Sequence, residues 1–208
     1  MPYTLTADKN FSLGGKQYLH QEVIENSPLE GSAELIPVAQ PGILTTRTDL
    51  DTGSLTMDSA SHGIATGNKI DLYWTNADGT IGSRRGMTVG AVAGVVVPID
   101  LGLGADLPVA ATVIQAAVVQ AFDVTITGDD AIAILGACDA ARCTIVLMSA
   151  GGTVEQLAIV LPAVKVYEWL ATSGQPNPIV GDVIDKLHMT HNDTVTPREV
   201  RLAALLDV

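Results

Sequence analysis

Short segments in which apolar and polar residues alternate recur along this chain about every ten residues, with turn residues between them. In Ile70–Trp74 the alternation is strict, so Ile70, Leu72 and Trp74 would share one face of a strand. The following Asn76–Gly79 has the composition of a hairpin turn. This spacing is typical of β-sandwiches and small β-barrels, and it predicts a mainly β fold.

About a dozen strands are expected from this pattern. We place them at 43–48, 54–57, 70–74, 86–92, 95–99, 111–119, 122–127, 143–148, 155–161, 164–169, 183–190 and 199–206. One short helix is predicted at Asp129–Gly136, because its acids would lie in the first turn and Gly136 could end it.

Three consecutive parts are predicted along the chain. Residues 1–41 are irregular and rich in proline, and we expect an extended N-terminal arm with one short strand at most. The same residues suit an ordered lead-in to the chain's own domain equally well. Residues 42–120 are expected to form a β-barrel-like domain, and residues 121–208 a β-sandwich-like domain.

The charge of the chain argues against nucleic acid and membrane as partners. The net charge is −12, spread evenly over both halves, and Arg84-Arg85 is the only adjacent basic pair. Binding a duplex requires clustered Lys and Arg that displace counterions. The longest apolar run, 109–119, is interrupted by Gln115 and is too short to span a bilayer. The start of the chain has no secretory pattern, so we expect synthesis in the cytoplasm.

Residues that often bind metals have spacings here that do not favour a metal site. His188 and His191 are three residues apart, but on a strand such positions point to opposite faces. Cys138 and Cys143 lack a second pair that would complete a zinc site. We interpret them as two free thiols packed in the core, while a loop disulfide stays open as an alternative in an oxidising environment.

The residues that could suggest a catalytic or phosphate-binding motif also lack the required arrangement. Asp58, Ser59, Ser61 and His62 are neighbours in sequence, yet adjacent residues on an extended chain rarely converge on one point. Gly102–Asp106 is rich in glycine but lacks the Lys-Ser/Thr ending of a phosphate loop.

The remaining acids and aromatic residues have structural explanations. Asp129-Asp130 fits a helix start, and the pairs Tyr73-Trp74 and Tyr167–Trp169 fit core packing better than a sugar-stacking platform. We therefore predict no catalytic residue, no metal ion and no cofactor.

The segment Ser61–Ile70, with the sequence SHGIATGNKI, resembles a sequence motif that is common in bacteriophage virion proteins. In those proteins a His-Gly-hydrophobic-x-Thr-Gly-Asp loop leads into a strand of a small β-barrel, whereas this chain has Asn68 at the position of the Asp. Phe122–Val208 is similar in composition to the β-sandwich modules of phage head and tail proteins, with short strands rich in Ala, Val, Thr and Gly and with few charges. The resemblance implies a structural protein of the virion.

The resemblance leads to a first functional hypothesis and two alternatives. We expect a non-enzymatic capsid cement or decoration protein, made in the host cytoplasm and located in the virion. Its partners would be other copies of itself, as a homo-oligomer, and virion proteins such as the major capsid protein. The alternatives are a tail tube or baseplate component, and a carbohydrate-binding module of a receptor-binding protein. A hydrolase with an unrecognised site at His62 or His188 is the remaining rival.

Overall fold

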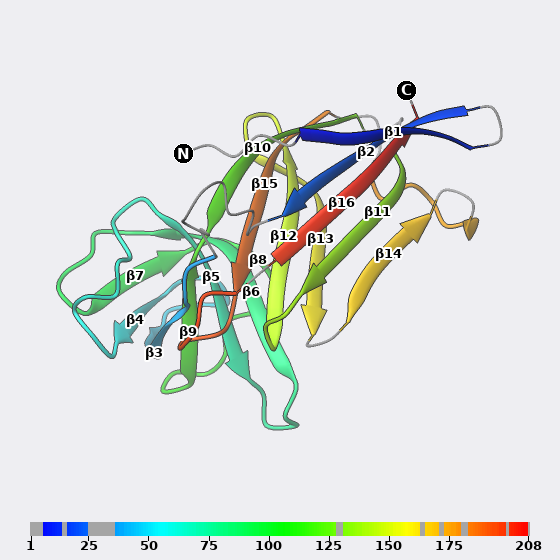
Figure 1. Cartoon of the computed structure of the whole chain (residues 1–208). Coiled ribbons are helices and arrows are strands. Elements are labelled where there is room, and N and C mark those ends of the chain that lie inside the picture. The colour runs from blue at the N-terminus through cyan, green and yellow to red at the C-terminus, as the bar shows by residue number, and fades with distance from the viewer. Residues whose placement is uncertain are drawn as a thin grey trace. The chain divides into compact units, whose positions relative to one another are not determined.

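A computed structural model of the chain shows a mainly β protein, as the sequence predicts (Figure 1). It describes residues 6–13, 16–24, 36–127, 131–162, 165–170, 173–179, 183–198 and 200–207. Every named element in these ranges is a strand: β1 (Thr6–Leu13), β2 (Lys16–Ile24), β3 (Gln40–Arg47), β4 (Gly53–Met57), β5 (Lys69–Thr75), β6 (Ile81–Val89), β7 (Val96–Asp100), β8 (Leu103–Gly104), β9 (Val113–Val118), β10 (Gln120–Thr127), β11 (Ala131–Cys138), β12 (Arg142–Ser149), β13 (Val154–Pro162), β14 (Val166–Leu170), β15 (Val183–His191) and β16 (Val200–Asp207).

The chain divides into two compact units that are not continuous in sequence. Unit 2 consists of Pro37–Val119 and Thr190–Pro197. Unit 1 consists of Gln120–Met189 together with the described residues up to Ile36 and those from Arg198 onward. This arrangement differs from the three consecutive domains expected from the sequence, because pairing between distant strands decides which segments belong together.

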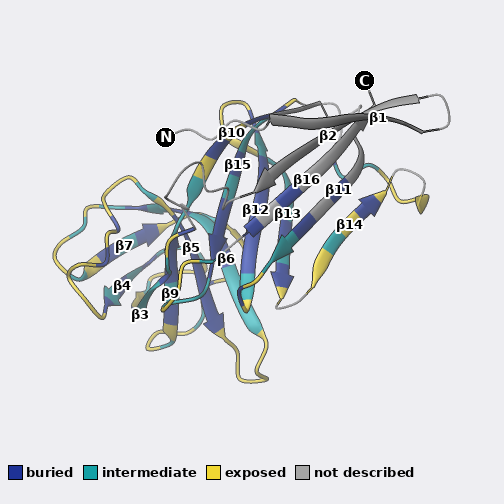
Figure 2. Cartoon of the chain, viewed as in Figure 1, coloured by how far each residue is buried: buried dark blue, intermediate teal, exposed yellow. Residues whose placement is uncertain are grey.

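Unit 1 contains two antiparallel sheets that share one hydrophobic core. The strand orders are β1-β2-β16-β11-β14 and β10-β15-β12-β13. Ile134 of β11 and Leu202 of β16 are buried in the same cluster as Ile145 of β12 and Leu187 of β15. The predicted hairpin between β12 and β13 is present, and Figure 2 shows β12 buried along most of its length.

The predicted helix at 129–136 is wrong for the part that the structure describes. Residues 131–136 belong to β11, while Asp129 and Asp130 lie outside the described residues. β11 pairs with β14 on one side and with β16 on the other. Hydrogen bonds along both edges favour an extended backbone, and such pairing outweighs local signals of a helix start.

The N-terminal residues contribute two strands, where the sequence predicted an arm with one short strand at most. β1 and β2 form an antiparallel pair, and β2 also pairs with β16 from Arg201↔Ile24 to Asp207↔Tyr18. The described part of 1–36 therefore belongs to the chain's own unit 1, which was the alternative to an extended arm. The sequence left the two alternatives open, because the partner strand β16 is at the far end of the chain.

Unit 2 is a ring-like sheet. Its strands follow the order β5-β9-β3-β4-β7-β6, and β6 pairs back with β5, while the short β8 is added beside β6. Ile70, Leu72 and Trp74 are all buried in the core of the ring, which confirms the face predicted from their alternation. The same core contains alternate residues of the other ring strands, such as Leu44 and Ile114.

Gly82 of β6 lies directly opposite Trp74 of β5, so the indole ring packs where a side chain would otherwise stand. A Cβ at this position would be 2.4 Å from Cε2 of Trp74. Gly82→Ala should therefore destabilise the protein by about 1–3 kcal/mol through overpacking, measured by urea denaturation. The neighbouring Ser83→Ala serves as the control, with an expected change within about 0.5 kcal/mol. A Gly82→Ala variant as stable as wild type would contradict this packing.

Candidate functional site

A row of uncharged side chains crosses the outer face of the ring-like sheet in unit 2. The register pairs Val113 of β9 with Ile43 of β3, Ile43 with Thr56 of β4, and Thr56 with Val96 of β7. Directly paired residues of antiparallel strands point to the same face. Val113, Ile43 and Val96 are 61%, 41% and 40% exposed. We call these four residues the aliphatic row.

The aliphatic row faces outward because its sequence neighbours fill the core. Ile114, Leu44, Leu55 and Val97 each adjoin one member of the row, and all four are fully buried. Alternation along each strand therefore turns the row away from the core. Single exposed aliphatic residues are common, but here three of them and Thr56, whose hydroxyl is hydrogen bonded to that of Thr45, lie in register across four neighbouring strands, which makes this face a candidate contact surface.

Three exposed leucines lie on loops at the ends of these strands. Leu50 is in the turn between β3 and β4, Leu101 follows β7, and Leu103 begins β8. Leu101 has a positive φ of 66°, a conformation that is strained for a residue with a side chain. The surrounding structure must hold this loop in place.

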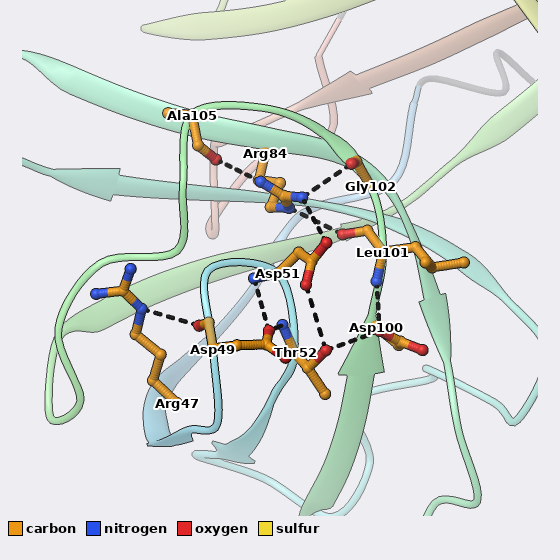
Figure 3. Close-up of polar contacts among 9 residues, drawn as sticks. All are labelled: Arg47, Asp49, Asp51, Thr52, Arg84, Asp100, Leu101, Gly102 and Ala105. Atoms are coloured by element: carbon orange, nitrogen blue, oxygen red, sulfur yellow. Dashed lines mark hydrogen bonds and ion pairs between the residues drawn. The ribbon is translucent and has the colours of Figure 1, made fainter.

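The buried guanidinium of Arg84 holds the loop, as Figure 3 shows. Its Nε donates to the Leu101 carbonyl at 2.8 Å, its Nη2 to that of Gly102 at 2.9 Å, and its Nη1 to that of Ala105 at 3.0 Å. Asp51 lies 3.7 Å from Nη2 and supplies the opposite charge. A planar, permanently charged fork with five donors suits this task. Arg84 is therefore a positioning residue for the loop that carries the exposed leucines.

The turn between β3 and β4 is fastened to the same loop. Asp49 Oδ1 accepts the backbone N–H groups of Asp51 at 3.0 Å and Thr52 at 2.7 Å. The Thr52 hydroxyl donates to Asp100 Oδ1 at 2.8 Å, and that oxygen also accepts the N–H of Leu101. These bonds join the two leucine-bearing loops through short polar side chains (Figure 3).

Part of the outer face of the ring is covered by the chain itself. On β5, Asp71 and Tyr73 point away from the ring core, yet both are buried. The Thr190 hydroxyl donates to Asp71 Oδ2 at 2.6 Å, so the Tyr73 hydroxyl, also 2.6 Å from it, must donate to Thr190. Ala39 and Ala117 complete this small cluster. Thr190 therefore covers part of β5, whereas the aliphatic row is uncovered within the described chain.

A shallow pocket of about 460 Å³ lies beside Trp74 and is lined mainly by small and apolar residues. The ring of Trp74 is only 3% exposed, and its indole N–H donates to Asn76 Oδ1 at 2.9 Å. Asp106 is the charged residue of the lining. Because Trp74 is buried and its indole N–H is already hydrogen bonded, the pocket does not provide an exposed aromatic face on which a sugar could stack. Trp169 is also buried, in the core of unit 1.

His62 and His191 are buried and hydrogen bonded to the backbone. His62 is buried, with Nε2 donating to the Gly94 carbonyl at 3.0 Å and Nδ1 accepting the N–H of Ile64. Both ring nitrogens are thus bonded to backbone. Nearby, the Ser59 hydroxyl oxygen accepts the N–H of Ser61. His188 and His191 belong to different units, and Nδ1 of the buried His191 accepts the N–H of Asp193.

The cysteines are the remaining reactive side chains of the sequence analysis. Cys143 is buried in the core of unit 1, and Cys138 packs against the same core while partly exposed. The hydrogen bond between their thiols lowers the pKa of Cys138 and, with burial, raises that of Cys143. The structure thus brings together two thiols that sequence reasoning interpreted mainly as packing residues.

Searches for other kinds of site and for relatives gave negative results. Within the described residues, no group of three or more His, Cys, Asp and Glu side chains could bind a metal ion. The described part of the chain also contains no helix with the length and hydropathy needed to cross a membrane. The sequence matches no protein-family model, and no curated protein matches it significantly.

Arg84→Lys should release the loop that Arg84 holds. A lysine ammonium cannot reach the carbonyls of Leu101, Gly102 and Ala105 together, so part-buried acceptors lose their charged partner. We expect a loss of about 2–4 kcal/mol of unfolding free energy and faster amide hydrogen exchange at 101–105. The control is Arg47→Lys, because Arg47 makes an exposed bond to the Asp49 carbonyl and should matter little. Equal effects of the two variants would refute the positioning role.

Asp49 and Asp51 should titrate in a fixed order. The backbone N–H of Asp51 holds the pKa of Asp49 below its usual value. Its hydrogen bond to Asp49, then burial and the Asp49 charge, raise the pKa of Asp51, while Arg84 lowers it in part. As pH rises, carboxyl NMR signals should therefore show Asp49 ionising first.

The stability contributions of this pair oppose each other. The lowered pKa of Asp49 contributes stability that is lost as pH falls through its folded value. The raised pKa of Asp51 contributes stability at low pH that is lost as pH rises through its folded value. Asp49→Asn removes two causes that raise the pKa of Asp51, so this pKa should fall. An unchanged Asp51 titration in that variant would show that the pair is not coupled.

Proposed function

We propose that this chain is a non-enzymatic structural protein of a bacteriophage virion, and specifically a capsid cement or decoration protein. The ring-like sheet of unit 2 would correspond to the small β-barrel of such proteins, and the two sheets of unit 1 to their β-sandwich. The SHGIATGNKI resemblance lies at the entrance to β5, a ring strand. Within the virion, the protein would act through stable contacts rather than through turnover.

The aliphatic row is the observation on which this proposal depends. The net charge of −12 makes copies of the chain repel one another over most of their surface. Ile43, Thr56, Val96 and Val113 carry no charge and lie in one line across four strands. Burial of apolar area contributes about 25 cal/mol per Å². Contact is therefore most favourable where the repulsion is weakest and apolar area is available.

The size of the row indicates its place within a larger interface. Specific interfaces bury roughly 1,200–2,000 Å² in total, which is more than four side chains can provide. The row would form the apolar centre of the contact, with more polar residues around it.

Mass in solution and position in the particle test the proposal directly. We expect wild-type protein to self-associate in sedimentation velocity, more strongly in 0.5 M than in 0.05 M salt because salt screens the charge repulsion, with a Debye length of about 10 Å at 0.1 M. In cryo-electron microscopy of intact particles the chain should lie on the capsid. A location in the tail tube or baseplate would favour the alternative virion role.

Ile43→Lys should weaken self-association at least tenfold, because it places a charge in the centre of the aliphatic row. Val195→Lys is the matched control, since Val195 is 85% exposed and lies outside the row. Both variants should keep the circular dichroism spectrum of wild type. A protein that is monomeric at all concentrations and absent from particles would overturn the proposal.

A further inference from the structure

Cys138 and Cys143 lie where the chain passes from one sheet of unit 1 to the other. Cys138 ends β11, which belongs to the five-stranded sheet, and Cys143 is the second residue of β12 in the four-stranded sheet. Only the tight connection Asp139–Ala141 and Arg142 separate them. A bond between the two sulfurs would therefore cross-link the two sheets at the edge of their common core.

The two thiols have unequal surroundings. Cys143 is 0% exposed, whereas Cys138 is partly open to solvent. The Cys138 sulfur accepts the N–H of Ala140 at 3.3 Å and is also hydrogen bonded by the Cys143 thiol. The Cys143 thiol and then the Ala140 N–H stabilise a thiolate on Cys138, and although partial burial and Asp139 act in the opposite direction, the pKa of Cys138 is lowered. Burial and the neighbouring sulfur raise the pKa of Cys143.

The different surroundings of the two thiols match the two roles in thiol–disulfide exchange, those of the attacking and the resolving thiol. The attacking sulfur must be accessible and ionised, and the resolving sulfur must lie within reach of it. A disulfide requires a sulfur–sulfur bond of about 2.05 Å, and the hydrogen bond between the two thiols shows that the sulfurs already face each other across the short connection from β11 to β12.

We propose that Cys138 and Cys143 form a reversible disulfide by exchange with a low-molecular-weight disulfide. The Cys138 thiolate attacks one sulfur of the small disulfide, breaks its S–S bond and expels a thiolate. Cys143 then transfers its proton to the expelled thiolate and attacks the Cys138 sulfur, which releases the second small thiolate. Two protein thiols are oxidised in total, and one small disulfide is reduced to two thiols. This modification is independent of the proposed virion role.

The modification would respond to the surroundings of the protein. The thiols would stay reduced in the cytoplasm and become joined in an oxidising medium. The cross-link restricts the unfolded chain, and for so short a loop we expect a rise of roughly 4–8 °C in the midpoint of thermal unfolding.

Oxidised glutathione is a suitable probe on the folded full-length chain. After treatment and alkylation, the wild-type mass should be lower by two hydrogens, with no alkylated thiol, and dithiothreitol should restore both thiols. Cys143→Ala should instead retain one glutathione on Cys138, because the resolving thiol is missing. Cys138→Ser should remain unmodified, because the buried Cys143 is a poor nucleophile.

Three results would overturn the proposal. They are a wild-type chain that keeps two alkylatable thiols, a wild-type chain that accumulates the mixed disulfide, and a Cys143→Ala variant that gains no glutathione. Should either variant fail to fold, the mass of the treated wild type and its unfolding midpoint, with and without dithiothreitol, still decide the question.

Discussion

The buried carboxylate of Asp71 connects three parts of unit 2, and the arrangement of its outer surface depends on it. One oxygen accepts the N–H of Gly86 across the β5–β6 pair at 2.7 Å, and the other accepts the hydroxyl of Thr190. A buried charge is costly unless hydrogen bonds compensate it. These two bonds join the closing pair of the ring to a segment more than a hundred residues away in sequence.

This fastening divides the outer face of the ring-like sheet into two regions with different properties. Over β5 and β9, Ala39, Tyr73 and Ala117 are buried with the Thr190 segment. Over β3, β4 and β7, Ile43 and Val96 are exposed. The first region is already covered by residues of the same chain. The second leaves aliphatic side chains exposed, and the proposed contact surface lies there.

Local patterns predicted much of the strand content, because alternation and turn residues act over a few positions. The Ile70–Trp74 face and the β12–β13 hairpin are examples that the structure confirms. The helix at 129–136 was wrong because two-sided pairing of β11 cannot be seen in its own sequence. The strand β2 was missed for the same reason, since its partner β16 is distant in sequence.

The site was less predictable than the fold. Arg84 was seen only as half of a basic pair, and nothing in its neighbours indicates that its guanidinium binds the carbonyls of 101–105. The aliphatic row requires the register of four strands, which single-sequence patterns do not provide. The sequence offers one weak sign of the row. Ile43 and Val113 are aliphatic residues at positions that face solvent in their strands.

Ring closure has a consequence for how this protein can grow into an assembly. Each of the six strands from β5 to β6 around the ring has a neighbour on both sides, although β6 and β7 pair at only two positions, so the ring leaves little backbone edge for an added strand. The two sheets of unit 1 end in β1 and β14 and in β10 and β13, and β14 carries Glu168, whose charge discourages indiscriminate pairing at that border. Apart from the two-residue strand β8, the ring of unit 2 therefore offers mainly side chains to a neighbour, which favours partners of matching shape over extension by strand addition.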